Sequence, residues 1–142
     1  MKVEILKTDK GLPLPKCQHR GDAGMDLYSS ESYTLKSGER KLFFVGFRLS
    51  VPFGYEIQTR PRSGLALEHG ITLLNSPGTI DYQYRGDIGI ILVNHSDKEF
   101  EIKKGDRIAQ MILSKIENIE FEEVEKLSET ERGEGGFGST GK

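Results

Sequence analysis

Short apolar segments, each bounded by turn residues, recur along this chain of 142 residues and leave little choice of fold class. In one of them Phe100 and Ile102 face one way, while the charged residues between and beside them face the other. Such alternation is typical of a β-strand with one wet face. The segments lie at 3–6, 41–51, 54–60, 70–76, 87–94, 99–103 and 107–116. Many short strands at this spacing predict an all-β sandwich or jelly roll.

The choice of apolar residues also favours strands. The chain has 12 Ile and 5 Val but only 3 Ala, and β-branched side chains pack well in sheets but lose rotamer freedom in helices. We expect one short helix in SGLALEH, which starts near Arg62 or Ser63 and ends at Gly70. The length fits one domain, predicted over 1–127 and followed by a tail at 128–142.

The tail contains five glycines and a single apolar side chain, Phe137, so it cannot bury enough apolar surface to order itself. Its glycines match dinucleotide-binding and P-loop patterns, but those sites need a strand before and a helix after the glycines. We therefore exclude them. Glycine N–H groups can still approach a phosphate closely, so we expect a flexible arm that acts as a lid, with a solubilising tail as the alternative.

Charge and cysteine content exclude several function classes. Twenty Lys and Arg against 22 Asp and Glu give a net charge of −2. The overall charge of the chain therefore does not attract nucleic acid or an acidic membrane. A lone Cys17 excludes an internal disulfide, and no Cys/His spacing indicates zinc. No apolar run approaches 18 residues. We expect a cytoplasmic protein without nucleic-acid or membrane partners and without a secretion signal.

Five motifs, in order over nearly the whole chain, resemble those of the homotrimeric dUTP diphosphatases (dUTPases). They are AGMDLYS at 23–29, PRSGLA at 61–66, NSPGTIDYQYRGDI at 75–88, GDRIAQMIL at 105–113 and RGEGGFGSTG at 132–141. The resemblance implies a jelly-roll-like β-clip subunit with one short helix, a homotrimer, and hydrolysis of dUTP to dUMP and diphosphate.

The second motif has anion-binding chemistry of its own. A helix that starts at Ser63-Gly64 offers free N–H groups beside the Arg62 guanidinium, although an ordinary helix start is the alternative. The resemblance implies that Arg62, Ser63 and Gly64 contact the phosphate chain.

Asp81 is the candidate general base. It follows Ile80 in an expected hairpin where Gly78 and Gly86 allow close backbone approach. We expect partial burial to hold this carboxylate and tune its proton affinity; a plain turn aspartate is the alternative. The resemblance implies that Asp81 activates a water for attack on the α-phosphorus.

The resemblance also implies the other binding residues. Asn75 reads uracil together with hairpin backbone at Gly78, Thr79, Ile80 and Gly89. Tyr84 packs on the sugar and excludes a 2′-hydroxyl, unless it is a core aromatic. Gln110 lies at the phosphates, unless it is a satisfied core glutamine. Asp26 supports the phosphate and metal region, with a structural ion pair as the alternative.

The remaining implications concern the arm, the metal and the assembly. Arg132 and Ser139 hold the γ-phosphate, and Phe137, next to Gly138, stacks on the base. A single Mg²⁺ is held by triphosphate oxygens and waters, with no direct protein ligand. Each site combines the hairpin residues of one subunit, the residues 62–64 and 110 of a second, and the arm of a third.

Two other functions remain open at this point. A dCTP deaminase of the same fold relies on a pocket Glu and a more Arg-rich helix motif, whereas this chain has Ile80-Asp81 and PRSGLA. A non-catalytic nucleotide-binding module is disfavoured because every expected polar group is present.

Overall fold

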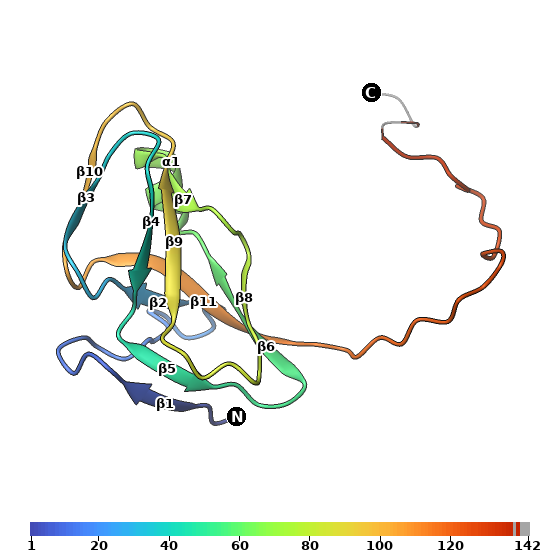
Figure 1. The fold of residues 1–142 in the computed structure, drawn as a ribbon, viewed down its shortest axis with the longest axis horizontal. Coiled ribbons are helices and arrows are strands. Elements are labelled where there is room, and N and C mark those ends of the chain that lie inside the picture. Colours follow the sequence, from blue (N-terminus) through green and yellow to red (C-terminus); the bar gives the residue numbers. More distant parts are fainter. Residues whose placement is uncertain (138, 140–142) are drawn as a thin grey trace.

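The computed structural model describes residues 1–137 and 139, and in that part of the chain it contains short antiparallel strands and one short helix (Figure 1). The elements are β1 (Glu4–Lys7), β2 (Met25–Tyr28), β3 (Tyr33–Leu35), β4 (Arg40–Phe44), β5 (Phe47–Ser50), β6 (Tyr55–Arg60), α1 (Ser63–His69), β7 (Ile71–Leu73), β8 (Gly78–Ile80), β9 (Gly89–Asn94), β10 (Phe100–Ile102) and β11 (Arg107–Lys115). The predictions of a mostly β protein and of a helix that ends at Gly70 are confirmed.

One predicted segment is in fact two strands. The apolar run at 41–51 divides between β4 and β5, which pair with different partners. Gly46 lies between them with φ 75°, a conformation that favours glycine. A Cβ on Gly46 would lie 2.8 Å from Asp9 Cβ. Alternation alone did not show this break, because both neighbouring segments are apolar.

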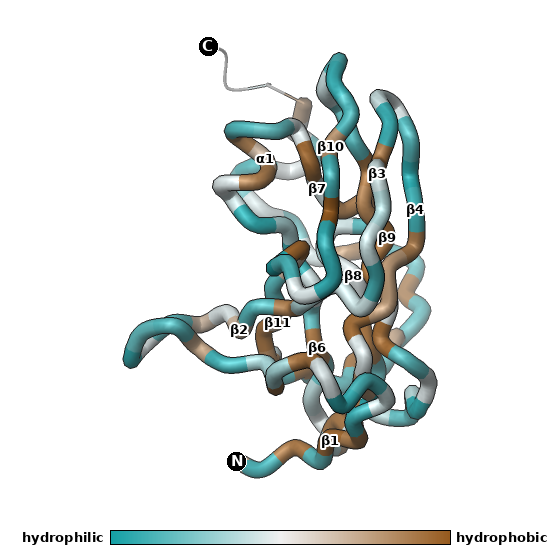
Figure 2. The backbone as a smooth tube through the Cα atoms, turned by 90° about the vertical axis from the view of Figure 1, so that its left-hand side faces the viewer, coloured by the Kyte–Doolittle hydropathy of each residue, from teal (hydrophilic) through white to brown (hydrophobic). Residues whose placement is uncertain are grey.

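Two sheets form the body. The larger has the order β2-β11-β6-β8 and the smaller β4-β9-β7, while β1-β5 and β10-β3 are two-stranded ribbons. The buried apolar residues of these strands form one core cluster, and apolar stretches are seen as brown segments along several strands (Figure 2). The largest fully buried side chains include Phe43, Leu27, Ile90, Leu92 and Ile108. This shared core holds the two sheets in fixed relation, and so fixes the residues at their edges.

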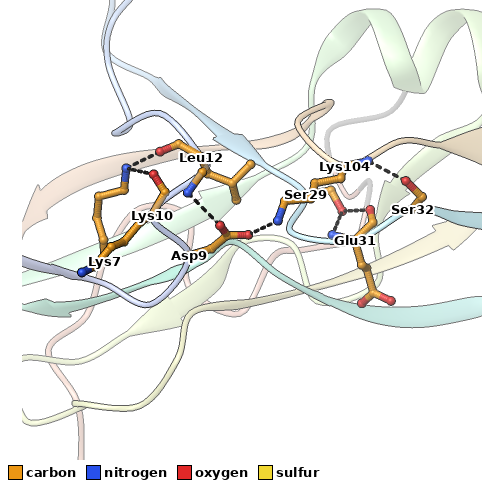
Figure 3. A network of polar contacts seen from close by, with 9 residues as sticks. Lys7, Asp9, Lys10, Leu12, Ser29, Glu31, Ser32 and Lys104 are labelled. Carbon is orange, nitrogen blue, oxygen red and sulfur yellow. Dashed lines mark hydrogen bonds and ion pairs between the residues drawn. The ribbon is translucent and has the colours of Figure 1, made fainter.

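A polar network ties the N-terminal segment to the loops beside it (Figure 3). Lys104 Nζ lies 2.5 Å from Asp9 Oδ2, and the Lys104 backbone N–H donates to Ser32 Oγ at 2.9 Å. Asp9 Oδ1 accepts from the Gly11 N–H at 2.9 Å. The side-chain hydrogen bond from Lys104 holds the pKa of Asp9 below its ordinary value.

After β11 the chain leaves the body (Figure 1). The Ile116 N–H still donates to Gly54 O, and the following segment extends outward. Its apolar side chains lie open to solvent, with Phe121 88% and Leu127 80% exposed. The departure precedes residue 127, where composition placed the end of the domain. In the part of the chain that the structure describes, no helix has the length and apolarity needed to cross a bilayer.

Candidate functional site

Most of the predicted site residues of the body fall into two groups, which also include two residues that sequence analysis did not predict, Arg107 and Ile88. We call Asp26, Arg62, Arg107 and Gln110 the arginine cluster, and we call the group Thr79, Ile80, Asp81, Tyr84, Ile88 and Gly89 the hairpin pocket. The first group lies around the start of α1, and the second lies between β8 and β9.

Arg62 connects three elements of the arginine cluster. It is the residue before α1, with extended backbone, and its side chain does not cap the helix. Its guanidinium donates through Nη1 to the Arg107 carbonyl oxygen at 2.8 Å, and its Nε lies 3.3 Å from Asp26 Oδ1. The guanidinium is therefore fixed beside β2 and β11.

The Asp26 carboxylate lies between two guanidinium groups. Its Oδ2 accepts from Arg107 Nη1 at 3.1 Å and from Gln18 Nε2 at 3.1 Å. The Asp26 side chain is 13% exposed. Within one chain Asp26 thus forms the structural ion pairs that sequence analysis gave as the alternative. Its pair with Arg62 orients the Arg62 guanidinium.

Gln110 is half-buried and bonded to the segment that precedes α1. Its Nε2 donates to Pro61 O at 2.9 Å. Its Oε1 lies so close to Gly24 that a Cβ there would be 2.1 Å away. This contact explains the glycine in the first motif, since any side chain at position 24 would displace the Gln110 amide.

The hairpin pocket has a volume of about 180 Å³ and is lined by the six residues that define it. A Cβ on Gly86 would lie 2.3 Å from the Tyr84 hydroxyl oxygen, and a Cβ on Gly89 would lie 2.6 Å from Leu42 Cδ1. A side chain at either position would therefore push the Tyr84 or the Leu42 side chain aside. Asn75 is exposed in the loop before β8, with its Nδ2 beside Gly78.

Tyr84 lies at the surface, not in the core. Its ring is 47% exposed and its hydroxyl donates to Asp87 O at 3.1 Å. Arg85 Nη1 donates to Tyr84 O at 2.8 Å and also bonds Tyr82 O, which keeps the loop curled. A hydrogen bond from Arg48 lowers the pKa of Asp87, so this neighbouring carboxylate is already paired.

The expected partial burial of Asp81 is wrong for a single chain. Asp81 is exposed, because it follows an edge strand and begins a surface turn in which the Tyr84 N–H donates to Asp81 O at 3.1 Å. Within this chain no element of the described fold covers the Asp81 carboxylate.

The two groups lie at opposite edges of the larger sheet. The arginine cluster is at the β2 edge and the hairpin pocket follows β8 at the other. Register pairs Ile80 with Ile57 and Gln110 with Arg60, so Asp81 lies level with Ser114, two strands away from β11. Gln110 lies four residues along β11 from Ser114, and β8 lies two strand spacings from β11. These two displacements together place the Asp81 and Gln110 backbones about 16 Å apart.

The predicted arm residues contact other arm residues. Arg132 Nε donates to Gly135 O at 2.8 Å, and the Ser139 N–H donates to Gly136 O at 3.0 Å. Phe137 is fully exposed. Gly138 lies outside the described residues.

Two members of the cluster's network were missed by sequence reasoning. Arg107 falls inside the fourth motif, but its partner Asp26 is 81 residues away. Gln18 lies in a loop with no pattern of its own, and only its contact with Asp26 identifies it. Among the described residues, no three His, Cys, Asp or Glu side chains gather as a metal-binding group.

Comparison with known proteins identifies the family. A family model described as dUTPase matches residues 10–141. The deoxyuridine 5′-triphosphate nucleotidohydrolase of Nautilia profundicola is 54% identical over 142 residues, which is 100% of both chains. That of Finegoldia magna is 57% identical over 143 residues and 99% of each chain.

A solved structure has the same fold. The dUTPase of Staphylococcus bacteriophage 80alpha, as a G164S mutant with dUpNHpp, is 28% identical and superimposes with a TM-score of 0.90. The match covers 99% of this chain and 98% of the phage protein.

Proposed function

Since this chain belongs to the dUTPase family and hydrolyses dUTP, we propose that the arginine cluster and the hairpin pocket are two halves of one active site that closes between subunits. Its activity is that of a dUTP diphosphatase. The deaminase alternative is set aside, because full-length relatives of more than 50% identity are dUTP nucleotidohydrolases.

The hairpin pocket is the nucleoside half of this proposal. Its backbone at Gly78, Thr79, Ile80 and Gly89 presents donors and acceptors to a pyrimidine edge, and the Asn75 amide can do both. A pocket of about 180 Å³ suits a single base. The exposed Tyr84 ring at its rim is placed to pack on the sugar and leave no room for a 2′-hydroxyl.

Asp81 is the proposed general base beside this pocket. It takes a proton from a water that attacks the α-phosphorus in line with the departing diphosphate. Its exposure in one chain leaves it accessible to substrate, and cover by neighbouring chains would exclude bulk water during the reaction.

The arginine cluster is the phosphate half. Arg62 is a fixed cation at the start of α1, where the N–H groups of Ser63 and Gly64 have no partner within the helix. Gln110 adds an amide beside them. Asp26 and Arg107 hold the Arg62 guanidinium in place before substrate arrives, so binding spends little entropy on ordering it.

A homotrimer with shared sites is supported by the position of the halves. The backbones of Asp81 and Gln110 are about 16 Å apart across the sheet, too far for both side chains to act on one α-phosphate. An apolar row of Leu42, Ile91 and Leu74 crosses the outer face of the smaller sheet, with the exposed Phe44 beside it. This face continues from Gly89 of the pocket and suits a second copy.

The arm is the proposed third contribution. We retain a β-domain over 1–127 and an arm over 128–142, in which Arg132 and Ser139 hold the γ-phosphate and Phe137 stacks on the base. The outward course of the chain after β11 (Figure 1) and the bare Phe137 ring support a role on a neighbour.

The family uses Mg²⁺, and we propose that it is held through the triphosphate and water. The residues fit that arrangement, because both Asp26 oxygens already face guanidinium groups, while the cluster offers cations to phosphate. The metal would neutralise phosphate charge. A cytoplasmic location also stays a proposal, based on the lone Cys17.

Subunit complementation tests the shared site. Asp81→Asn and Arg62→Ala are purified separately, mixed 1:1, unfolded and reassembled. Random mixing restores about a quarter of the parent activity, because one site in four receives both intact residues. A mixture of Asp81→Asn with Asn75→Ala, both in the hairpin half, should gain nothing. Failure of the first mixture to gain activity would place both halves in one chain.

A further inference from the structure

The loop before β2, residues 13–24, touches the arginine cluster at two points. The Gln18 side chain donates to Asp26 Oδ2 at 3.1 Å, and Gly24 lies against the Gln110 amide. The loop is otherwise exposed, apart from a half-buried Pro15 and Gly24. It therefore forms a side wall of the proposed phosphate half, although no motif residue precedes position 23.

The loop backbone holds Gln18 in position. The His19 N–H donates to Asp22 Oδ2 at 2.7 Å, and the Asp22 N–H donates to His19 O at 3.2 Å. Cys17 Sγ donates to Asp22 O at 3.3 Å. A turn closed by its own hydrogen bonds thus follows Gln18, so the amide can reach Asp26 without a large loss of entropy.

Gln18 completes the set of donors around the Asp26 carboxylate. Oδ1 faces Arg62, while Oδ2 is shared by Arg107 and Gln18. With Gln18 removed, the carboxylate can rotate toward Arg107, which is itself 45% exposed. The contact between Asp26 Oδ1 and Arg62 Nε, already 3.3 Å long, is the one that such a rotation opens.

An amide suits this place better than a carboxylate. One carboxylate and two guanidiniums leave the cluster with one net positive charge, which attracts a triphosphate. A neutral N–H donor satisfies Asp26 without altering that charge. Glutamate at position 18 would set acceptor against acceptor and cancel the cluster's charge.

We propose that Gln18 is a positioning residue for the triphosphate: it fixes the Asp26 carboxylate, which in turn fixes the Arg62 guanidinium. This inference rests on the proposed function, because it assumes that Arg62 binds substrate phosphate. It predicts an effect on substrate binding and not on the chemical step.

A donor series tests it. Gln18→Met keeps the size but removes the donor, Gln18→Glu replaces it with an acceptor, and Gln18→Lys keeps a donor. We measure kcat and KM for dUTP hydrolysis with Mg²⁺, and the dissociation constant of dUpNHpp by calorimetry. Ser37→Ala is the matched control, since it removes another exposed loop hydrogen bond, to Ser96 O at 2.6 Å.

Gln18→Met should raise KM and the dUpNHpp dissociation constant by about threefold to tenfold, with kcat within about twofold of the parent. Gln18→Glu should raise KM and the dUpNHpp dissociation constant further than Gln18→Met does. Gln18→Lys and Ser37→Ala should leave both constants at the values of the parent. If Gln18 served only to stabilise the loop, the KM values of the variants would not depend on whether the new side chain is a hydrogen-bond donor or an acceptor.

Equal KM values for the Met, Glu and parent proteins, all with the same melting temperature, would overturn the inference. A rise in KM in the Lys variant as large as the rise in the Met variant would also overturn the inference. A parent protein that binds dUTP without releasing diphosphate would instead contradict the proposed function, so the two failures are distinct.

Discussion

The arginine cluster and the hairpin pocket are built in different ways. In the cluster, charged side chains from β2, β11 and the start of α1 are locked by mutual hydrogen bonds and by the loop residue Gln18. In the pocket no such network of charged side chains is present among the described residues; Gly86 and Gly89 lie close to the side chains of Tyr84 and Leu42, and Asp81 is exposed.

The difference follows from what each half has to recognise. Long cationic side chains are flexible, so they bind phosphate well only if neighbours fix them first. A pyrimidine edge can be read by backbone groups that the sheet already holds in place. One chain therefore preorganises the charged side chains of the arginine cluster, whereas it leaves Asp81 beside the hairpin pocket exposed.

The largest effect is expected from a substitution at Asp81, the proposed reactive group beside the hairpin pocket. Asp81→Asn removes the proposed base but keeps the size of the side chain, so kcat should fall by about 10²-fold to 10⁴-fold with little change in KM. Steady-state release of diphosphate measures both constants. Asp87→Asn is the control, since that carboxylate pairs with Arg48; activity retained in Asp81→Asn would remove the residue from its role.

A smaller effect is expected where the cluster loses its geometry but keeps its charge. Arg62→Lys cannot reach both Asp26 and the Arg107 carbonyl, because an ammonium lacks the fork of a guanidinium. KM for dUTP should rise by about tenfold, with a smaller change in kcat. An unchanged KM would mean that charge alone suffices and that the contrast between the halves is overstated.

The smallest effect lies outside both halves, at Asp9. Because the bond from Lys104 depresses the folded-state pKa of Asp9, this group stabilises the fold above its unfolded pKa and loses that contribution as pH falls through the folded value. Asp9→Asn should lower the melting temperature at pH 7, and the difference should shrink in acid. Parallel melts at both pH values check this, and kcat should not change.

The sequence predicts the local parts of this molecule better than their arrangement. The helix bounds and most strands follow from periodicity and from Gly70, since these are short-range effects. The exposure of Asp81 does not follow, because it depends on β8 being an edge strand. The Asp26 contact with Arg107 depends on the pairing of β2 with β11, which lies 81 residues further along the chain at this contact. The Asp26 contact with Gln18 depends on how the loop before β2 folds back, which no pattern in that loop encodes.

The segment after β11 has a consequence for how the protein behaves in solution. Ile119, Phe121 and Leu127 are bare, a hazard for aggregation, yet eight glutamates lie among and after them between residues 117 and 134. Repulsion between the carboxylates of different chains opposes aggregation through these apolar side chains. Replacement of these glutamates by glutamine, which removes the charges but keeps the size of the side chains, should therefore make the chain precipitate at a lower concentration.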